Sequence, residues 1–76
     1  MNGRMDFSQA LVLIKQGKRL TRTGWNGKGM TVEIQRPDEH SKMTLPYLFI
    51  RTTDKKNVPW VASVTDLLAE DWEVVE

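Results

Sequence analysis

The stretch YLFIRTTDKKNVPW (residues 47–60) decides the fold of this chain. Its first seven residues favour a β-strand over Tyr47–Thr53, with apolar side chains on both faces, which is typical of a strand inside a sheet or against another subunit. The polar run at 54–57 predicts a hairpin turn into a second strand over Val58–Ala62. Pro59 cannot donate a hydrogen bond to a neighbouring strand, so we expect this second strand at a sheet edge.

A helix is expected upstream of the hairpin, from about Phe7 to Gln16. Asp6 is placed as its N-cap, and Gln9 three positions later completes a capping-box pattern. Gly17 provides the left-handed residue that ends a helix. One face of this helix is apolar at helical spacing, through Phe7, Ala10, Leu11 and Ile14.

Strand patterns occupy most of the remaining chain. A short strand is expected over Arg19–Thr23, and alternation predicts a half-buried strand over Met30–Gln35. Ser63 is the expected N-cap of a short helix, with Asp66 in the capping-box position, before a closing strand over Trp72–Val75. The prediction is a small antiparallel sheet of the α+β class, with an N-terminal helix and a short helix before the last strand. We expect Trp72, Val74, Leu67 and Leu68 in its core.

Length and composition predict one domain over residues 1–76. A chain of 76 residues buries only about 60–65% of its unfolded surface, so its own core is marginal. The sequence has no cysteine, which excludes disulfides and thiolate metal sites as support, and it favours self-association instead. No apolar run has the length of a membrane span or a signal peptide, and a cytoplasmic protein is expected.

The two halves of the chain carry opposite charge. Residues 1–37 hold seven Lys/Arg against two Asp/Glu, and residues 38–76 hold four against eight. The basic half can attract phosphates, although its positive charges are scattered and do not form a continuous nucleic-acid-binding face. Pairing of opposite charges between the halves, or between subunits, is an equal alternative.

The loop Gly24–Gly29, of sequence GWNGKG, is the first candidate site. Trp25 presents a flat face on which a base can stack, and Asn26-Gly27 readily forms turns. Gly27 permits a close approach of backbone N–H groups to a phosphate, and Lys28 adds positive charge. The alternative is that Trp25 fills the core, and the residue chemistry alone favours that alternative.

The second candidate site follows Pro59. Trp60 is either a second aromatic wall or a structural residue that fills the core or a subunit contact. Asp66, with Ser63 and Thr65, is suited to hydrogen bonds with ribose hydroxyls, whereas a purely structural capping box is the favoured interpretation from sequence. Arg22 either faces a phosphate or forms a surface ion pair.

Glu70 and Asp71 are neighbours at a helix end and are expected to lie in a solvated turn. No residues here predict catalysis, a metal site or a cofactor, so we expect a binding protein that is not an enzyme.

Both clusters resemble a known family. "GWNGKGM" and "PYLFIRTTDKKNVPWVASVTDLLAEDWEVVE", together with the opening "DFSQALVLIKQGKRLTRTGWNGKGM", are similar to the second type of Thoeris anti-defense protein. The resemblance implies a small α+β domain that assembles as a homotetramer. It also implies a sponge that sequesters glycocyclic ADP-ribose, the cyclic ADP-ribose signal of Thoeris defence, without cleaving it. Some members also take up cyclic dinucleotides at a separate site.

The resemblance favours the ligand-binding interpretation of the candidate site residues over the structural one. It implies a ligand-binding set of Arg22, Trp25, Asn26, Gly27, Lys28, Trp60, Ser63, Thr65 and Asp66. Two features depart from the usual pattern: the segment Gln35–Thr44, and Val64 where many members have a polar residue. The main alternative function is a protein-interaction module that inhibits a host protein directly through the strand at 47–53. A nucleotide-processing enzyme and a single-stranded nucleic-acid binder are further alternatives.

Overall fold

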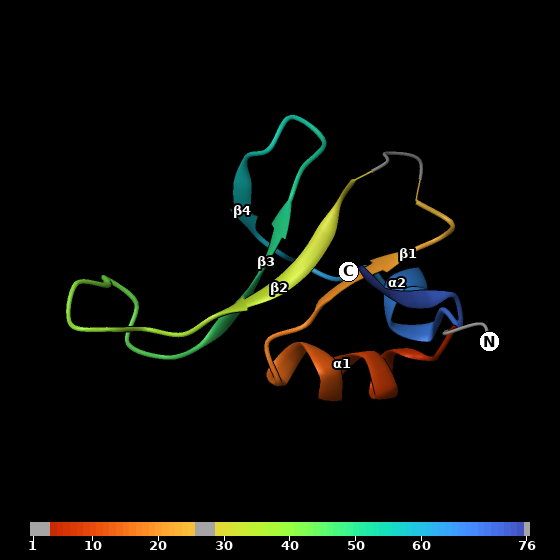
Figure 1. The fold of residues 1–76 in the computed structure, drawn as a ribbon, viewed down its shortest axis with the longest axis horizontal. Helices are drawn as coiled ribbons and strands as arrows, with labels where there is room; N and C mark the ends of the chain where they lie inside the picture. Colours follow the sequence, from red (N-terminus) through yellow and green to blue (C-terminus); the bar gives the residue numbers. More distant parts are fainter. Residues whose placement is uncertain (1–3, 26–28, 76) are drawn as a thin grey trace.

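Five antiparallel strands form one sheet in the computed structural model, which describes residues 4–25 and 29–75 (Figure 1). The order of the strands across the sheet is β4-β3-β2-β1-β5. The architecture is α+β, as predicted. Its elements are α1 (Phe7–Lys15), β1 (Arg19–Arg22), β2 (Thr31–Gln35), β3 (Tyr47–Arg51), β4 (Asn57–Pro59), α2 (Val64–Leu68) and β5 (Trp72–Val75).

The predicted start and stop signals of α1 are confirmed. An oxygen of the Asp6 side chain accepts a hydrogen bond from the Gln9 backbone N–H at 2.9 Å, and the Gln9 side chain accepts one from Asp6 N–H at 3.1 Å. This reciprocal pair satisfies N–H groups that have no partner inside the helix. Gly17 has a φ of +95°, the left-handed conformation expected where the chain leaves the helix.

The hairpin of β3 and β4 is also confirmed, with Phe49 opposite Pro59 and Arg51 opposite Asn57. β3 lies inside the sheet, between β2 and β4, and β4 forms an edge as Pro59 predicted. β4 is shorter than expected at its far end, and it stops at Pro59 instead of continuing to residue 62. After one further backbone hydrogen bond, from Trp60 N–H to Leu48 C=O at 3.0 Å, the chain leaves the sheet toward α2.

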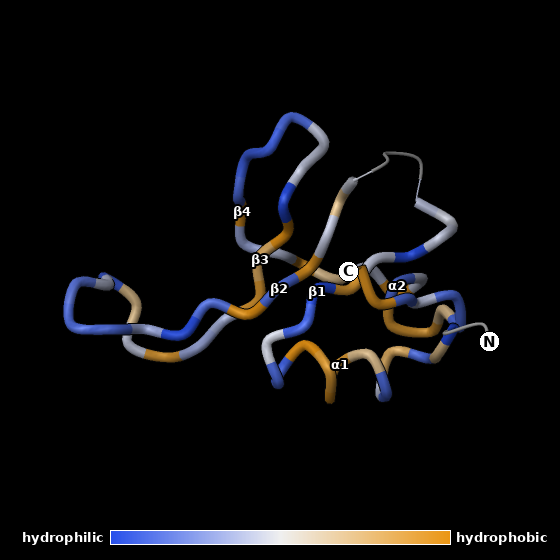
Figure 2. The backbone as a smooth tube through the Cα atoms, viewed as in Figure 1, coloured by the Kyte–Doolittle hydropathy of each residue, from blue (hydrophilic) through white to orange (hydrophobic). Residues whose placement is uncertain are grey.

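The core lies on one face of the sheet, where α1 packs across β1, β2 and β5 (Figure 1). Figure 2 shows apolar residues along α1 and along the strands that face it, and hydrophilic residues in the β3–β4 turn. Trp72 of β5 is fully buried and occupies the middle of this core. The other fully buried apolar residues are Ala10, Ile14, Leu20 and Val32.

Two predicted core residues are in fact exposed. Leu67 is 47% exposed and Leu68 is 76% exposed. The reason is that α2 has only five residues, and the residue that it buries is Asp66. The prediction of Leu67 and Leu68 in the core is therefore wrong, whereas Trp72 and the partly buried Val74 belong to the core as expected.

The opposite face of the sheet carries Glu33, Gln35, Tyr47 and Phe49. Their sequence neighbours Val32, Ile34, Leu48 and Ile50 all belong to the core or pack against it, so alternation places these four side chains on the other face. Within the described chain, α1 and α2 both lie on the core side. The segment between β2 and β3 projects beyond the sheet (Figure 1). Neither described helix has the length and apolarity needed to cross a membrane.

Candidate functional site

Asp66 brings together several of the predicted site residues. Its Oδ1 accepts hydrogen bonds from the indole Nε1 of Trp25 at 3.0 Å and from Nη1 of Arg22 at 2.9 Å. Its Oδ2 accepts the backbone N–H of Ser63 at 3.2 Å. Four of the predicted site residues, Arg22, Trp25, Ser63 and Asp66, thus lie together, although Arg22 and Asp66 are 44 positions apart in sequence. Their binding of a ligand stays a prediction.

The capping box predicted at α2 is confirmed. The Oγ of Ser63 accepts a hydrogen bond from Asp66 N–H at 3.1 Å and lies 2.9 Å from the Oγ1 of Thr65. Ser63 and Thr65 are exposed, whereas Asp66 is only 8% exposed. Two hydroxyl groups thus lie at the surface beside a buried aspartate, and the backbone N–H of that aspartate fixes the hydroxyl oxygen of Ser63.

Asp71 is a site residue that the sequence analysis missed. Its Oδ1 accepts a hydrogen bond from Arg22 Nε at 2.8 Å, and its Oδ2 accepts from Gly24 N–H at 2.8 Å and Thr23 Oγ1 at 3.2 Å. The expectation of a solvated turn is wrong for Asp71, which is half-buried. Arg22 lies 49 positions away in sequence, so no local pattern signals this pair.

Arg22 forms an ion pair with each of the two carboxylates. Its side chain is 17% exposed and lies between Asp66 and Asp71, at 2.9 Å and 2.8 Å. Of the two alternatives for Arg22, the ion pair is the one that the structure contains, and it is half-buried instead of lying on the surface. We call the set of Arg22, Gly24, Trp25, Asp66 and Asp71 the carboxylate network.

Hydrogen bonds keep both carboxylates of this network ionised. Burial raises the pKa of Asp66, but the hydrogen bonds from Trp25, Arg22 and Ser63 outweigh it, and the pKa lies below its ordinary value. Hydrogen bonding from Arg22 is the main reason that the pKa of Asp71 is also lowered. The pKa of Arg22 is raised by its hydrogen bond to Asp71 and, second in size, by its hydrogen bond to Asp66. The network therefore carries two negative charges and one positive charge at neutral pH.

An aromatic cluster lies beside the carboxylate network. Trp25 and Trp60 each contact Trp72 edge-to-face, with ring centroids 5.3 Å and 5.9 Å apart. Phe7 contacts Trp72 and Trp60 at 5.3 Å and 5.7 Å. Trp25 and Trp60 are both partly exposed, so each contributes to the core while keeping part of its surface open. Their stacking on a base stays a prediction.

Asn26, Gly27 and Lys28 lie outside the described residues. Gly29, which ends their loop, has a φ of +83°, a conformation that favours glycine. At the other end of the loop, the backbone N–H of Gly24 donates a hydrogen bond to the carboxylate of Asp71. The described ends of the loop are thus a hydrogen-bonded glycine next to Trp25 and a left-handed glycine before β2.

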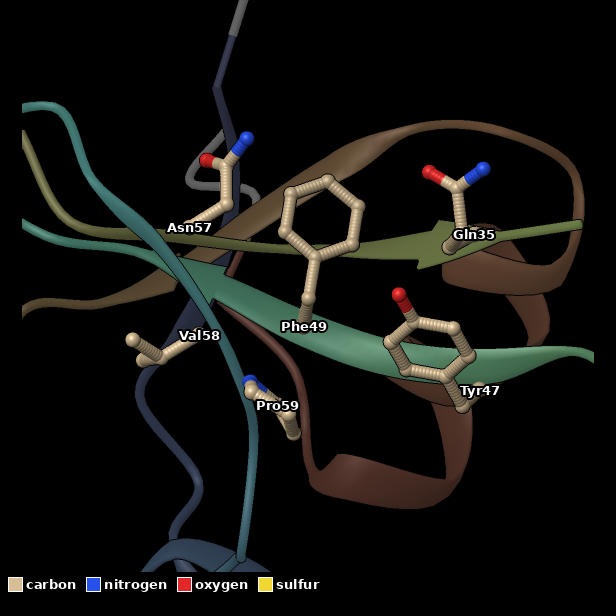
Figure 3. Close-up of a pocket in the computed structure, with 6 residues that line it drawn as sticks. All are labelled: Gln35, Tyr47, Phe49, Asn57, Val58 and Pro59. Carbon is tan, nitrogen blue, oxygen red and sulfur yellow. The ribbon is translucent and has the colours of Figure 1, made fainter. Parts of the chain in front are cut away.

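Some grooves lie elsewhere on the surface. One of about 120 Å³ lies on the open face of the sheet, where the rings of Tyr47 and Phe49 stand on the same side as the amides of Gln35 and Asn57 (Figure 3). Its volume is below the roughly 300 Å³ typical of small-molecule sites. Two shallow apolar grooves of about 390 and 410 Å³ lie beside α1 and beside residues 43–47. The linings of these three grooves include none of the nine predicted site residues.

Among residues 4–25 and 29–75, no three His, Asp or Glu side chains are grouped as metal ligands. The fold and the network together define a small single-sheet α+β domain, in which a tryptophan-bearing loop is tied to a capped helical turn.

Comparison with known proteins then places the chain. The Thoeris anti-defense 2-like domain family matches residues 5–75. The protein named Thoeris anti-defense 2 from Bacillus phage SP01 is 36% identical over 88 aligned residues, which cover 99% of each chain. The chain therefore belongs to the Thoeris anti-defense 2-like family, as the sequence resemblance indicated, and this membership supports an anti-defense role in the Thoeris pathway.

Proposed function

We propose that this protein binds glycocyclic ADP-ribose and sequesters it without cleaving it. The observation that carries the proposal is the fixed position of Trp25, whose indole N–H donates to Asp66 while its ring remains partly exposed. An indole held in this way presents a preorganised face to a base, and such stacking contributes roughly 1–3 kcal/mol per base. Family membership supplies the link to the Thoeris signal.

The polar groups beside Trp25 suit a ribose. Ser63 and Thr65 present hydroxyls at the surface, 2.9 Å from each other. Asp66 Oδ2 accepts one bond of 3.2 Å from Ser63 N–H and keeps lone-pair capacity for a ribose hydroxyl, whereas Oδ1 already has two donors. Arg22 contributes by holding the carboxylates, and we assign the phosphates to the backbone at Gly27 and to Lys28.

A site shared between subunits fits these observations better than a site within one protomer. Asp66 is almost fully buried, and the grooves described above, which are lined by residues among 4–25 and 29–75, do not include it. The exposed side chains of Val61, Val64 and Leu68, at 89%, 70% and 76%, are available for contact with another copy. Together with the family resemblance, this exposure supports our proposal of a homotetramer, in which Trp25, Asn26, Trp60 and Asp66 contribute to a common pocket from more than one protomer. A cyclic dinucleotide site is a second proposal for the same assembly.

Calorimetry with glycocyclic ADP-ribose tests the proposal. We expect the unaltered protein to release or absorb heat at protein concentrations on the order of 10 μM, and Trp25→Ala to lose at least tenfold in affinity, the equivalent of about 1.4 kcal/mol. Tyr47→Ala, on the opposite face of the sheet, is the matched aromatic control and should bind normally. Heat denaturation of the complex should return intact nucleotide, and recovery of a cleaved product would show an enzyme instead.

A specific observation favours the alternative of a protein-interaction module. Tyr47 and Phe49 stand partly exposed on the helix-free face of the sheet, beside the groove at Gln35 and Asn57 (Figure 3). Aromatic side chains of this kind are enriched at protein interfaces. A host protein captured by the unaltered chain and by Trp25→Ala, but lost with Tyr47→Ala, would support this alternative.

A further inference from the structure

We infer that Asp71 is a positioning residue of the nucleotide site: it fixes the start of the Trp25 loop through Gly24 and holds Arg22 against Asp66. The inference rests on the proposed function and assigns a role within that same site. The carboxylate oxygens of Asp71 accept hydrogen bonds from groups of the protein, and in this role Asp71 need not touch the ligand.

The geometry shows two routes from Asp71 to Trp25. On one route, Asp71 Oδ2 accepts the backbone N–H of Gly24, the residue next to Trp25, at 2.8 Å. On the other, Asp71 Oδ1 accepts Arg22 Nε, Arg22 Nη1 donates to Asp66 Oδ1, and that oxygen also accepts the Trp25 indole. One carboxylate therefore constrains both the backbone and the ring of the tryptophan.

Arg22 depends on Asp71 for its orientation. A guanidinium group is a planar fork, and binding its Nε edge to one carboxylate directs the Nη1 donor toward a second. Here the two distances are 2.8 Å to Asp71 and 2.9 Å to Asp66. Removing the Asp71 charge leaves Arg22 with a single carboxylate and frees its side chain to rotate away from that geometry.

The space around Gly24 supports the same conclusion independently. A Cβ atom at position 24 would lie 2.9 Å from Asp71 Oδ2 and 3.2 Å from Arg22 Nη2. The φ of Gly24 is not in the left-handed region, so an alanine there is compatible with the backbone. A Cβ atom at position 24 is thus incompatible with the present position of the Asp71 carboxylate. Gly24→Ala displaces the carboxylate while every charged group remains present.

Two readouts test the inference. The first is the affinity for glycocyclic ADP-ribose by calorimetry, and the second is the indole N–H resonance of Trp25 in the ligand-free protein. We expect Asp71→Asn and Gly24→Ala each to lower affinity roughly tenfold or more, as for one charge-assisted hydrogen bond, and to shift the Trp25 resonance. The Trp60 indole, which lies outside the carboxylate network and packs edge-to-face on Trp72, is the internal reference.

Matched controls separate positioning from stability. Glu70→Gln removes the neighbouring, exposed carboxylate and should change neither readout. Ile14→Val trims a buried core side chain that is not a member of the network, so it should lower Tm while affinity stays within twofold. A purely structural role would predict that affinity follows Tm across all four variants.

The outcomes distinguish the inference from the function on which it rests. Absence of binding by the unaltered protein would overturn the proposed function and the inference with it. Normal binding by the unaltered protein, combined with binding within twofold by Asp71→Asn and Gly24→Ala, would overturn the inference alone. If Asp71→Asn does not fold, Gly24→Ala decides between these outcomes, because its substitution adds a single methyl group at an exposed position.

Discussion

Asp66 connects four segments of the chain through one residue. Its side chain accepts from Arg22 in β1, from Trp25 in the following loop and from the backbone of Ser63, and its carbonyl accepts the indole of Trp72. A group with 8% exposure that remained unpaired would be destabilising. The structure instead gives this carboxylate three donors, so Asp66 both stabilises the fold and orients Trp25.

The carboxylate network predicts that stability falls in acid. The folded-state pKa values of Asp66 and Asp71 lie below the unfolded value of about 3.9. Their contribution to the free energy of unfolding is therefore complete above that unfolded value, and it is lost as pH falls through the lower folded values. Chemical denaturation from pH 6 down to pH 2 measures this loss, with most of it expected below about pH 4.

The aspartate variants provide the control for this pH dependence. Asp71→Asn should be less stable at pH 6 and should show a shallower loss toward acid, because the titrating group is absent. Asp54→Asn, in the exposed β3–β4 turn, should keep the full pH dependence of the unaltered protein. Equal slopes for Asp71→Asn and the unaltered protein would contradict the role of this ion pair.

At the scale of elements, α2 is too short to form without its caps. A helix of five residues has almost no intrahelical hydrogen bonds to offset the cost of nucleation. The reciprocal bonds between Ser63 and Asp66 satisfy orphan N–H groups at its start, and Asp66 anchors it to β1. The caps and the ion pair thus determine where α2 lies.

Removal of the Ser63 cap should destabilise the domain. We expect Ser63→Ala to lower the free energy of unfolding by about 1 kcal/mol, and Asp6→Ala at the matching position of α1 to have a similar effect. Ser63→Thr retains the capping oxygen and should cost only a few tenths of a kcal/mol. Urea denaturation at neutral pH measures all three, and a Ser63→Ala protein as stable as the original would contradict the capping geometry.

At the scale of the whole molecule, apolar side chains are exposed on α2 and on the segment before it. Val61, Val64 and Leu68 are at least 70% exposed, and Val64 and Leu68 lie one helical turn apart. Exposed apolar side chains grouped in this way mark interaction sites more often than isolated ones do. In a domain of this size, their burial in an assembly would add to a small core.

Disruption of this surface tests the proposed assembly. We expect Val64→Lys to shift the protein from a tetramer to smaller species in sedimentation velocity, because a buried charge opposes association. Thr53→Lys, which adds the same charge at an exposed position after β3, is the control and should leave the assembly unchanged. Sedimentation of the unaltered protein as a monomer would remove the assembly from the proposal.

Local signals predicted most elements of the fold. The caps at Asp6 and Ser63, the left-handed Gly17 and the edge position of Pro59 each follow from backbone groups within about four residues. The sequence was misleading at Leu67 and Leu68, because helical spacing alone does not tell which side of a five-residue helix meets the core.

The sequence by itself determined the elements, most of their ends to within two residues, and the family, because hydrogen-bonding needs and hydrophobic period act over short stretches of chain. Only the tertiary structure decided that Arg22 lies between Asp66 and Asp71, and that Trp25 donates to a buried carboxylate. These contacts join residues 41 to 49 positions apart, and their geometry requires β1 to lie beside β5. Ion pairing over such separations depends on which surfaces the fold brings together. The residues next to each partner in the sequence do not predict that arrangement.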